Sequence, residues 1–146
     1  MKGAGVTEAQ EKGSRINNRS DKGENNAAQI LAEEGYDVKQ LPENNPPPQP
    51  NPDIKLEGNI ADIFTPYKET SVEDVVKNGI IKKVDRKIPQ ARRVVINAVE
   101  DGNPITEKQL FDEIQKRRAA GDLRELEEVI LITGPPRKVV TVWPKA

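Results

Sequence analysis

Apolar residues recur along the chain at two different spacings, which predict alternating helices and strands. A helical spacing of three and four positions covers residues 21–34, 71–86 and 106–120. Shorter apolar or alternating segments predict six strands, at 36–41, 54–56, 60–64, 93–97, 129–133 and 139–143. The order is helix, three strands, helix, strand, helix and two strands. We therefore expect an α/β fold in which a mixed β-sheet is flanked by helices.

The start of the chain differs from the rest. Residues 1–22 contain few apolar residues and show no periodicity, which is typical of a flexible linker or tail. Residues 23–146 are rich enough in apolar residues to form one domain. The longest apolar run is the four residues 129–132, so the sequence predicts no membrane-spanning segment.

The composition limits the possible chemistry. The chain of 146 residues contains no cysteine and no histidine. A disulfide framework, a zinc-thiolate site and a Ser-His-Asp triad are therefore excluded. Any catalysis must depend on carboxylates, lysine, tyrosine or hydroxyl groups, and a metal ion would assist it.

The predicted hairpin at 54–64 carries the most informative carboxylates. With Gly58-Asn59 as a two-residue turn, Lys55 lies opposite Asp62 and Asp53 lies opposite Phe64. Asp53, Lys55 and Asp62 then share one face of the sheet, and the two aspartates are diagonal neighbours about 7–8 Å apart. A cation could bind between them. The alternative is that Lys55 and Asp62 form an ordinary cross-strand ion pair.

Glu24 supplies a third candidate carboxylate. Its helical neighbours Ala27, Ala28 and Leu31 form the face that should pack on the sheet, so the side chain of Glu24 should point inward. The alternative is that Glu24 only complements the helix dipole in the first turn.

A basic segment follows the hairpin. Residues 77–93 contain seven cations and one acid, Asp85. Such a segment either binds a phosphate backbone or forms a solvated helix face. Together with the carboxylates, it favours metal-dependent phosphodiester cleavage.

Two resemblances sharpen this hypothesis. Pro52-Asp53, followed by Asp62, resembles the PD-(D/E)xK nuclease signature, although Phe64 occupies the place of its usual lysine. More specifically, residues 24–146 resemble the C-terminal toxin domain of CdiA contact-dependent growth inhibition proteins, in the branch associated with tRNA cleavage. The matching stretches are Ala28 to Val38, Gln40-Leu41-Pro42, Asn51-Pro52-Asp53, Glu57-Gly58, Ala61-Asp62, Lys83-Val84, Gln90 to Asn97, Glu128-Val129-Ile130 and Thr141-Val142-Trp143-Pro144.

The resemblance implies a restriction-endonuclease-like core and a set of site residues. Glu24, Asp53 and Asp62 would bind a divalent metal ion (Mg²⁺, Mn²⁺ or Zn²⁺). Lys83 would be the catalytic lysine, with Lys87 as the alternative. Thr133 would supply an accessory hydroxyl. We expect substrate binding by Lys82, Arg86, Gln90 and Arg92.

The resemblance also implies partners and a location. The substrate would be tRNA or another nucleic acid, and a cognate immunity protein would neutralise the domain. The domain would be exported as the tip of a larger surface protein and act in the cytoplasm of a target cell. Two other functions stay open: a DNase on the same fold, and a non-catalytic binding or structural module associated with a phage or a secretion system.

Overall fold

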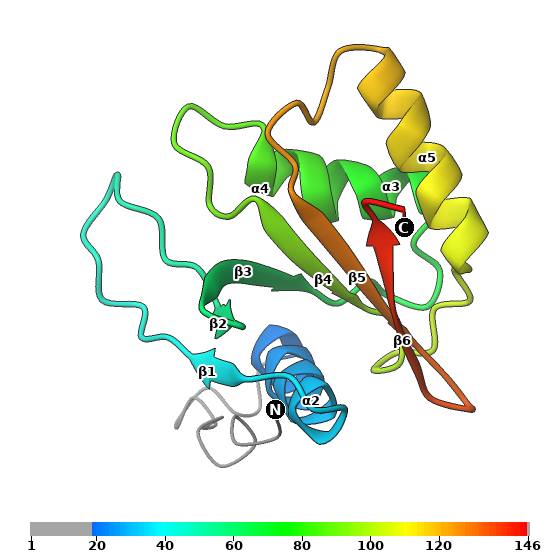
Figure 1. The fold of residues 1–146 in the computed structure, drawn as a ribbon, viewed down its shortest axis with the longest axis horizontal. Coiled ribbons are helices and arrows are strands. Elements are labelled where there is room, and N and C mark those ends of the chain that lie inside the picture. Colours follow the sequence, from blue (N-terminus) through cyan, green and yellow to red (C-terminus); the bar gives the residue numbers. More distant parts are fainter. Residues whose placement is uncertain (1–18, 146) are drawn as a thin grey trace.

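A six-stranded mixed sheet organises the molecule (Figure 1). The computed structural model describes residues 19–145. The strands follow one another across the sheet in chain order: β1 (Val38–Gln40), β2 (Ile54–Leu56), β3 (Asn59–Phe64), β4 (Arg93–Asn97), β5 (Glu128–Thr133) and β6 (Lys138–Trp143). The central strands β3, β4 and β5 are parallel, and the outer pairings are antiparallel.

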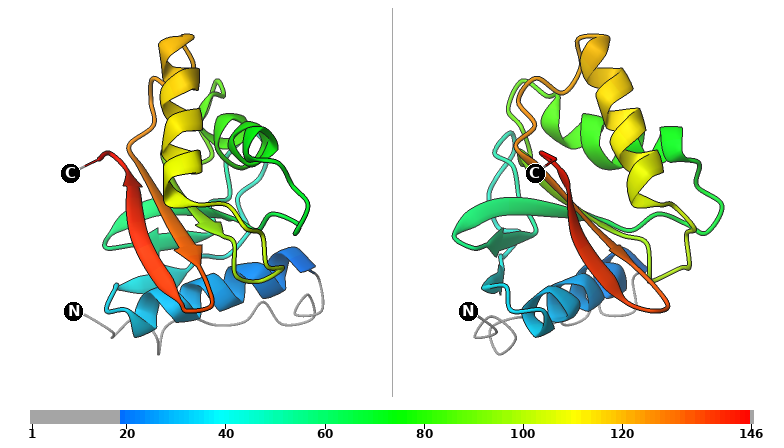
Figure 2. Two further views of the ribbon diagram at one scale, coloured as in Figure 1. Left: turned by 90° about the vertical axis from the view of Figure 1, so that its right-hand side faces the viewer. Right: turned by 45° about the vertical axis from the view of Figure 1, so that its right-hand side comes forward.

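Helices cover both faces of this sheet (Figure 2). Helix α2 (Arg19–Glu33) packs on one face. The other face carries α5 (Glu107–Ala119) and a continuous helical segment of three parts: α3 (Val72–Val76), the π-helical turn η2 (Lys77–Ile81) and α4 (Lys82–Val84). The predicted fold class, a mixed sheet flanked by helices, is confirmed.

Each face has its own apolar core. Ala28, Leu31, Val38 and Ile54 belong to the core under α2, and Ile80, Ile96, Leu110 and Leu131 to the core under α3 and α5. Alternation along the strands separates the two sets, because successive side chains point to opposite faces.

The predicted turn of the hairpin is wrong by one residue, and the predicted strand register is wrong with it. Lys55 lies opposite Ile60 and Leu56 opposite Asn59, so the turn is Glu57-Gly58. Both turn residues have positive φ, 51° and 83°, as a type I′ turn requires. Glu57 tolerates this conformation because its backbone N–H donates to the Asp37 carbonyl (2.8 Å) and its carboxylate accepts from the Asp37 N–H (2.6 Å).

Most element boundaries agree with the pattern, with small shifts. Helix α2 begins at Arg19, so Asp21 lies inside its first turn, and residues 19–22 of the expected linker are helical. Residues 1–18 lie outside the described part of the chain. The predicted helix 71–86 ends at Val84, and its Asn78-Gly79 step lies in the π-helical turn. In the part of the chain that the structure describes, no helix has the length and apolarity needed to cross a membrane.

Candidate active site

Two aspartates face each other where the hairpin opens. Continuing the β2–β3 register by one residue places Asp53 opposite Asp62. The Asp53 N–H donates to Asp62 Oδ1 (3.0 Å), and the Ile63 N–H donates to Asp53 Oδ2 (2.8 Å). Asp62 is 1% exposed. Backbone donors therefore hold both aspartates, Asp62 in a buried and Asp53 in a partly buried position. The two residues of this aspartate pair are directly opposed rather than diagonal.

Lys83 approaches the aspartate pair from α4. Its Nζ donates to Asp62 Oδ2 at 2.6 Å, while its side chain keeps a quarter of its exposure. Lys87 is exposed beyond the end of α4 and makes no ion pair within residues 19–145. Of the two candidate lysines, the structure brings Lys83 to the carboxylates.

Phe64, which occupies the position of the usual signature lysine, packs against a helix. Phe64 lies two residues after Asp62 on the same sheet face, and its ring covers Gly79 in η2. A Cβ atom on Gly79 would lie 2.5 Å from Phe64 Cδ2, so glycine allows a close approach of this helical segment. Lys83 follows Gly79 by four residues and so faces the same strand. Phe64 thus positions the helix that carries the lysine.

The ion pair considered for Lys55 does not form. Lys55 lies opposite Ile60, is exposed, and has no ion-pair partner among the described residues. The register shift explains this result, because it moves Lys55 away from Asp62, whose salt-bridge partner is Lys83. The prediction that Asp53, Lys55 and Asp62 share a sheet face is confirmed by the alternation along β2 and β3.

Glu24 reaches the same region from the opposite layer. Its side chain is buried on the sheet-facing side of α2, as predicted, and it accepts a long contact from Gln40 Nε2 (3.5 Å). The first turns of α2 lie close to the sheet because Gly23 has no side chain where Thr65 packs. Asn97 Nδ2 also donates to the Gly23 carbonyl (2.9 Å).

The electrostatics of Asp53 reflect its crowded surroundings. Burial raises the pKa of Asp53 from 3.8 to about 9, and the negative charges of Asp62 and Glu24 add to this effect. The hydrogen bond from the Ile63 N–H acts in the opposite direction. A carboxyl group in this position favours a bound proton or a bound cation.

A second acidic group, of which Glu24 is a member, was not predicted. Asp21, Glu24 and Glu43 each offer a carboxylate oxygen within 4.8 Å of the others, a set that could hold a metal ion. We call these residues the α2 acidic group. Among the described residues, the carboxylate oxygens of this set lie within 4.8 Å of one another, whereas those of Glu24, Asp53 and Asp62 do not form such a set. The i, i+3 spacing of Asp21 and Glu24 is visible in the sequence, but it does not reveal that Glu43 of the proline-rich loop lies beside them.

A groove of about 450 Å³ runs past β2, and its lining includes Pro52 and Lys55 but neither Asp53 nor Asp62. One wall is the proline-rich loop 42–52, and the other is formed by residues 89–93. Gln90 joins the walls, since its Nε2 donates to the Asn51 carbonyl (2.6 Å). Of the predicted substrate-binding residues, Gln90 and Arg92 line this groove, whereas Lys82 and Arg86 are exposed on and after α4.

Thr133 is not part of this cluster. Asp62 aligns with Val94, and Val94 aligns with Val129. Thr133 lies four residues further along β5, about 13 Å in the strand direction. It lines a different hollow, beside the turn that follows β5.

Both the fold and the sequence are similar to those of known proteins. The structure is similar to that of a CdiA-CT/CdiI toxin and immunity complex from Burkholderia pseudomallei, with a TM-score of 0.59 and 24% sequence identity over 90% of each chain. At that identity the likeness shows the fold alone. A model of the contact-dependent growth inhibition CdiA C-terminal domain matches residues 49–135, more than half of the chain. The chain therefore belongs to this family and is a CdiA C-terminal toxin domain. No curated protein matches it.

Proposed function

We propose that this toxin domain is a metal-dependent endonuclease that cleaves tRNA. One observation carries the proposal: Asp53 lies directly opposite the buried Asp62, and Lys83 Nζ is 2.6 Å from Asp62 Oδ2. These are the groups of the PD-(D/E)xK signature, with the lysine supplied by a helix. The choice of tRNA rests on the resemblance described above.

The carboxylates fit a divalent cation. Burial first, and then the charges of Asp62 and Glu24, raise the pKa of Asp53, and a bound cation would offset both effects. Asp53 and Asp62 would hold the ion, and Glu24 would complete its ligands from the α2 side. An all-oxygen donor set suits Mg²⁺ or Mn²⁺ better than Zn²⁺. When bound, such an ion neutralises phosphate charge and lowers the pKa of a water molecule.

The chain's own groups supply orientation and charge. The backbone N–H groups of Asp53 and Ile63 fix the two carboxylates. The partly exposed ammonium group of Lys83 can donate a hydrogen bond to a phosphate oxygen while its charge stays next to Asp62. Gln90 and Arg92 lie where the neighbouring nucleotides would pass.

We also propose a partner and a place of action. A cognate immunity protein would bind this domain, in line with the toxin and immunity complex that shares its fold. The domain would be delivered by a larger surface protein and act in the cytoplasm of the target cell, in line with its family.

The test is incubation of the purified chain with total bacterial tRNA, with and without Mg²⁺, Mn²⁺ or Zn²⁺. Asp53→Ala and Asp62→Ala should lower cleavage on the order of 10³-fold, because each removes a ligand for the charge that assists the reaction. Asp112→Ala is the matched control, since Asp112 is an exposed aspartate on α5 paired with Lys108. Melting curves check that each variant is folded.

Discrete fragments that need a metal ion and are lost in both site variants would support the proposal. Cleavage of DNA with intact tRNA would replace the substrate while keeping the site. Cleavage of neither polymer by the folded chain would favour the binding-module alternative and reject the nuclease.

A further inference from the structure

One part of the sheet has a face that none of the described helices covers. Among the described residues, the core under α3 and α5 includes none from β1 or β2. These two strands lie apart from α3, α4 and α5 (Figure 1). Their apolar side chains Val38 and Leu56 point toward α2, so Lys39 and Lys55 point to the uncovered face.

The uncovered face carries a row of three exposed side chains across three strands. Lys39 lies opposite Lys55, and Lys55 lies opposite Ile60. Ile60 is 48% exposed, one of the few large apolar side chains on the surface. The row therefore joins two cations to one apolar contact.

The two lysines oppose each other without compensation. Neither Lys39 nor Lys55 has an ion-pair partner within the described residues. Like charges directly opposite on neighbouring strands are destabilising. An anion bound between them would relieve this repulsion.

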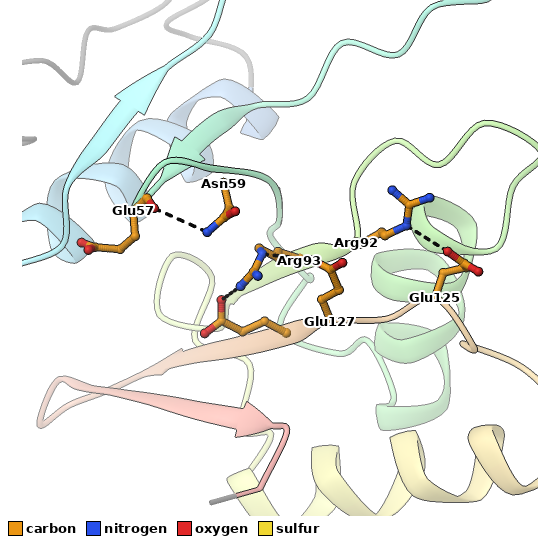
Figure 3. A network of polar contacts seen from close by, with 7 residues as sticks. Glu57, Asn59, Arg92, Arg93, Glu125 and Glu127 are labelled. Atoms are coloured by element: carbon orange, nitrogen blue, oxygen red, sulfur yellow. Dashed lines mark hydrogen bonds and ion pairs between the residues drawn. The ribbon is translucent and has the colours of Figure 1, made fainter.

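The nearby arginines are different, because each already has a carboxylate partner within the described residues. Arg92 Nε contacts Glu125 (3.0 Å), and Arg93 contacts both Glu127 (3.3 Å) and Glu128 (2.8 Å), as Figure 3 shows for this network. On the β1–β2 part of the sheet, unpaired positive charge among the described residues therefore comes from the lysine pair, while Lys82, Arg86 and Lys87 supply it on and after α4.

The lysine pair is continuous with the candidate active site. Lys55 of β2 lies two residues after Asp53, which directly precedes the strand, on the same face and about 7 Å along the chain. Lys55 and Ile60 also line the groove that contains Gln90 and Arg92. A nucleic-acid strand bound at the aspartate pair would pass Lys55 within the next few nucleotides.

We propose that Lys39 and Lys55 bind backbone phosphates of the nucleic-acid strand beside the cleaved bond, while Ile60 packs on a sugar or base of that strand. This inference rests on the proposed function for its substrate. Such phosphate contacts fix the position of the strand without reading its sequence.

The test measures binding rather than cleavage. In an Asp62→Asn background, which keeps the substrate intact, the affinity for labelled bacterial tRNA is measured by fluorescence anisotropy across roughly 50–200 mM salt. Lys39→Gln/Lys55→Gln should weaken binding about tenfold and reduce the salt slope by about 1.4, the loss of two contacts to a single strand. Lys116→Gln, at an exposed lysine on α5, should change neither quantity.

Stability separates binding from folding in this test. The double variant should melt at the same or a higher temperature, since it removes a like-charge pair. Lys39→Arg/Lys55→Arg should retain the affinity and the slope.

The outcomes are distinct from those of the nuclease test. An unchanged affinity and slope in the double glutamine variant would overturn the inference, as expected if this face serves only a protein partner. An equal loss in Lys116→Gln would also overturn it. A loss confined to the double variant would support it, even if the parent chain cleaves no tRNA.

Discussion

The aspartate pair and the α2 acidic group are two clusters of carboxylates in the same region, but their surroundings differ. The pair is fixed by backbone N–H donors and touched by one ammonium group, that of Lys83. The α2 acidic group has closer carboxylate oxygens, and one member, Glu43, is exposed on the proline-rich loop.

The difference shows that proximity of carboxylates is not the same as a reaction site. A cation needs several oxygens within reach, which the α2 acidic group offers. On the proposed chemistry, phosphate cleavage also needs a fixed geometry and a nearby positive group. The aspartate pair has backbone donors and Lys83 for these roles. Glu24 lies between the two clusters, since it belongs to one and its charge raises the pKa of Asp53 in the other.

In this comparison we expect the largest effect from removal of the Lys83 amine, which contacts the aspartate pair. Lys83→Met should lower tRNA cleavage roughly 10²–10³-fold, since it removes a donor that would stabilise negative charge on the phosphate. Single-turnover rates at saturating enzyme measure the chemical step. Lys87→Met, at the exposed lysine four residues later, should retain most activity. The reverse pattern would assign the role to Lys87.

Binding of the cation provides the next test. Added Mn²⁺ should raise the melting temperature by several degrees at a concentration about 100 times the dissociation constant, because a ligand specific to the folded state stabilises it by about 2.7 kcal/mol. Asp53→Asn should abolish most of this shift. Glu43→Gln, in the α2 acidic group, should leave it largely intact.

The opposite ranking would place the ion in the α2 acidic group. Loss of the Mn²⁺ shift in Glu43→Gln, with retention in Asp53→Asn, would show that the closer oxygens decide the site. Differential scanning fluorimetry is sufficient, with a chelator as the reference state.

The last test is a pH dependence of stability. Folding raises the pKa of Asp53 from 3.8 to about 9, so the folded protein binds more protons than the unfolded chain between these values. In the presence of a chelator, this group should therefore make the free energy of unfolding decrease as the pH rises from about 4 to about 9. Urea unfolding measures the slope.

Asp53→Asn should make that slope shallower, because the amide does not titrate. A wild-type slope in this variant would show that other groups cause the pH dependence. No comparable change is expected for Asp112→Asn, whose aspartate is exposed on α5.

The elements were predictable because their signals are local. The apolar spacing in α5 and its Thr106 cap, and the apolar run of β5, indicate helix and strand without tertiary information. The hairpin register was not predictable in this way. Gly58-Asn59 is the better turn by composition, but Glu57 is held in the turn by two hydrogen bonds to Asp37, twenty residues earlier.

The candidate site shows the same limit. Asp53, Asp62 and Glu24 were identified from spacing and helical face, and the structure brings these three to one region. The choice between Lys83 and Lys87 depends on how closely a helix docks on β3, which no periodicity reveals. Glu43 was missed because the path of a proline-rich loop is set by tertiary contacts.

The contact between Gly79 and Phe64 has a consequence for when this domain can act. Asp53 and Asp62 lie on one local hairpin. The ammonium group of Lys83 contacts Asp62 only when the helical segment that carries it is packed on the sheet. On the proposed chemistry, a chain with a formed hairpin and an undocked helix is latent. The proposed site would therefore be complete only in chains whose helical segment is packed on the sheet.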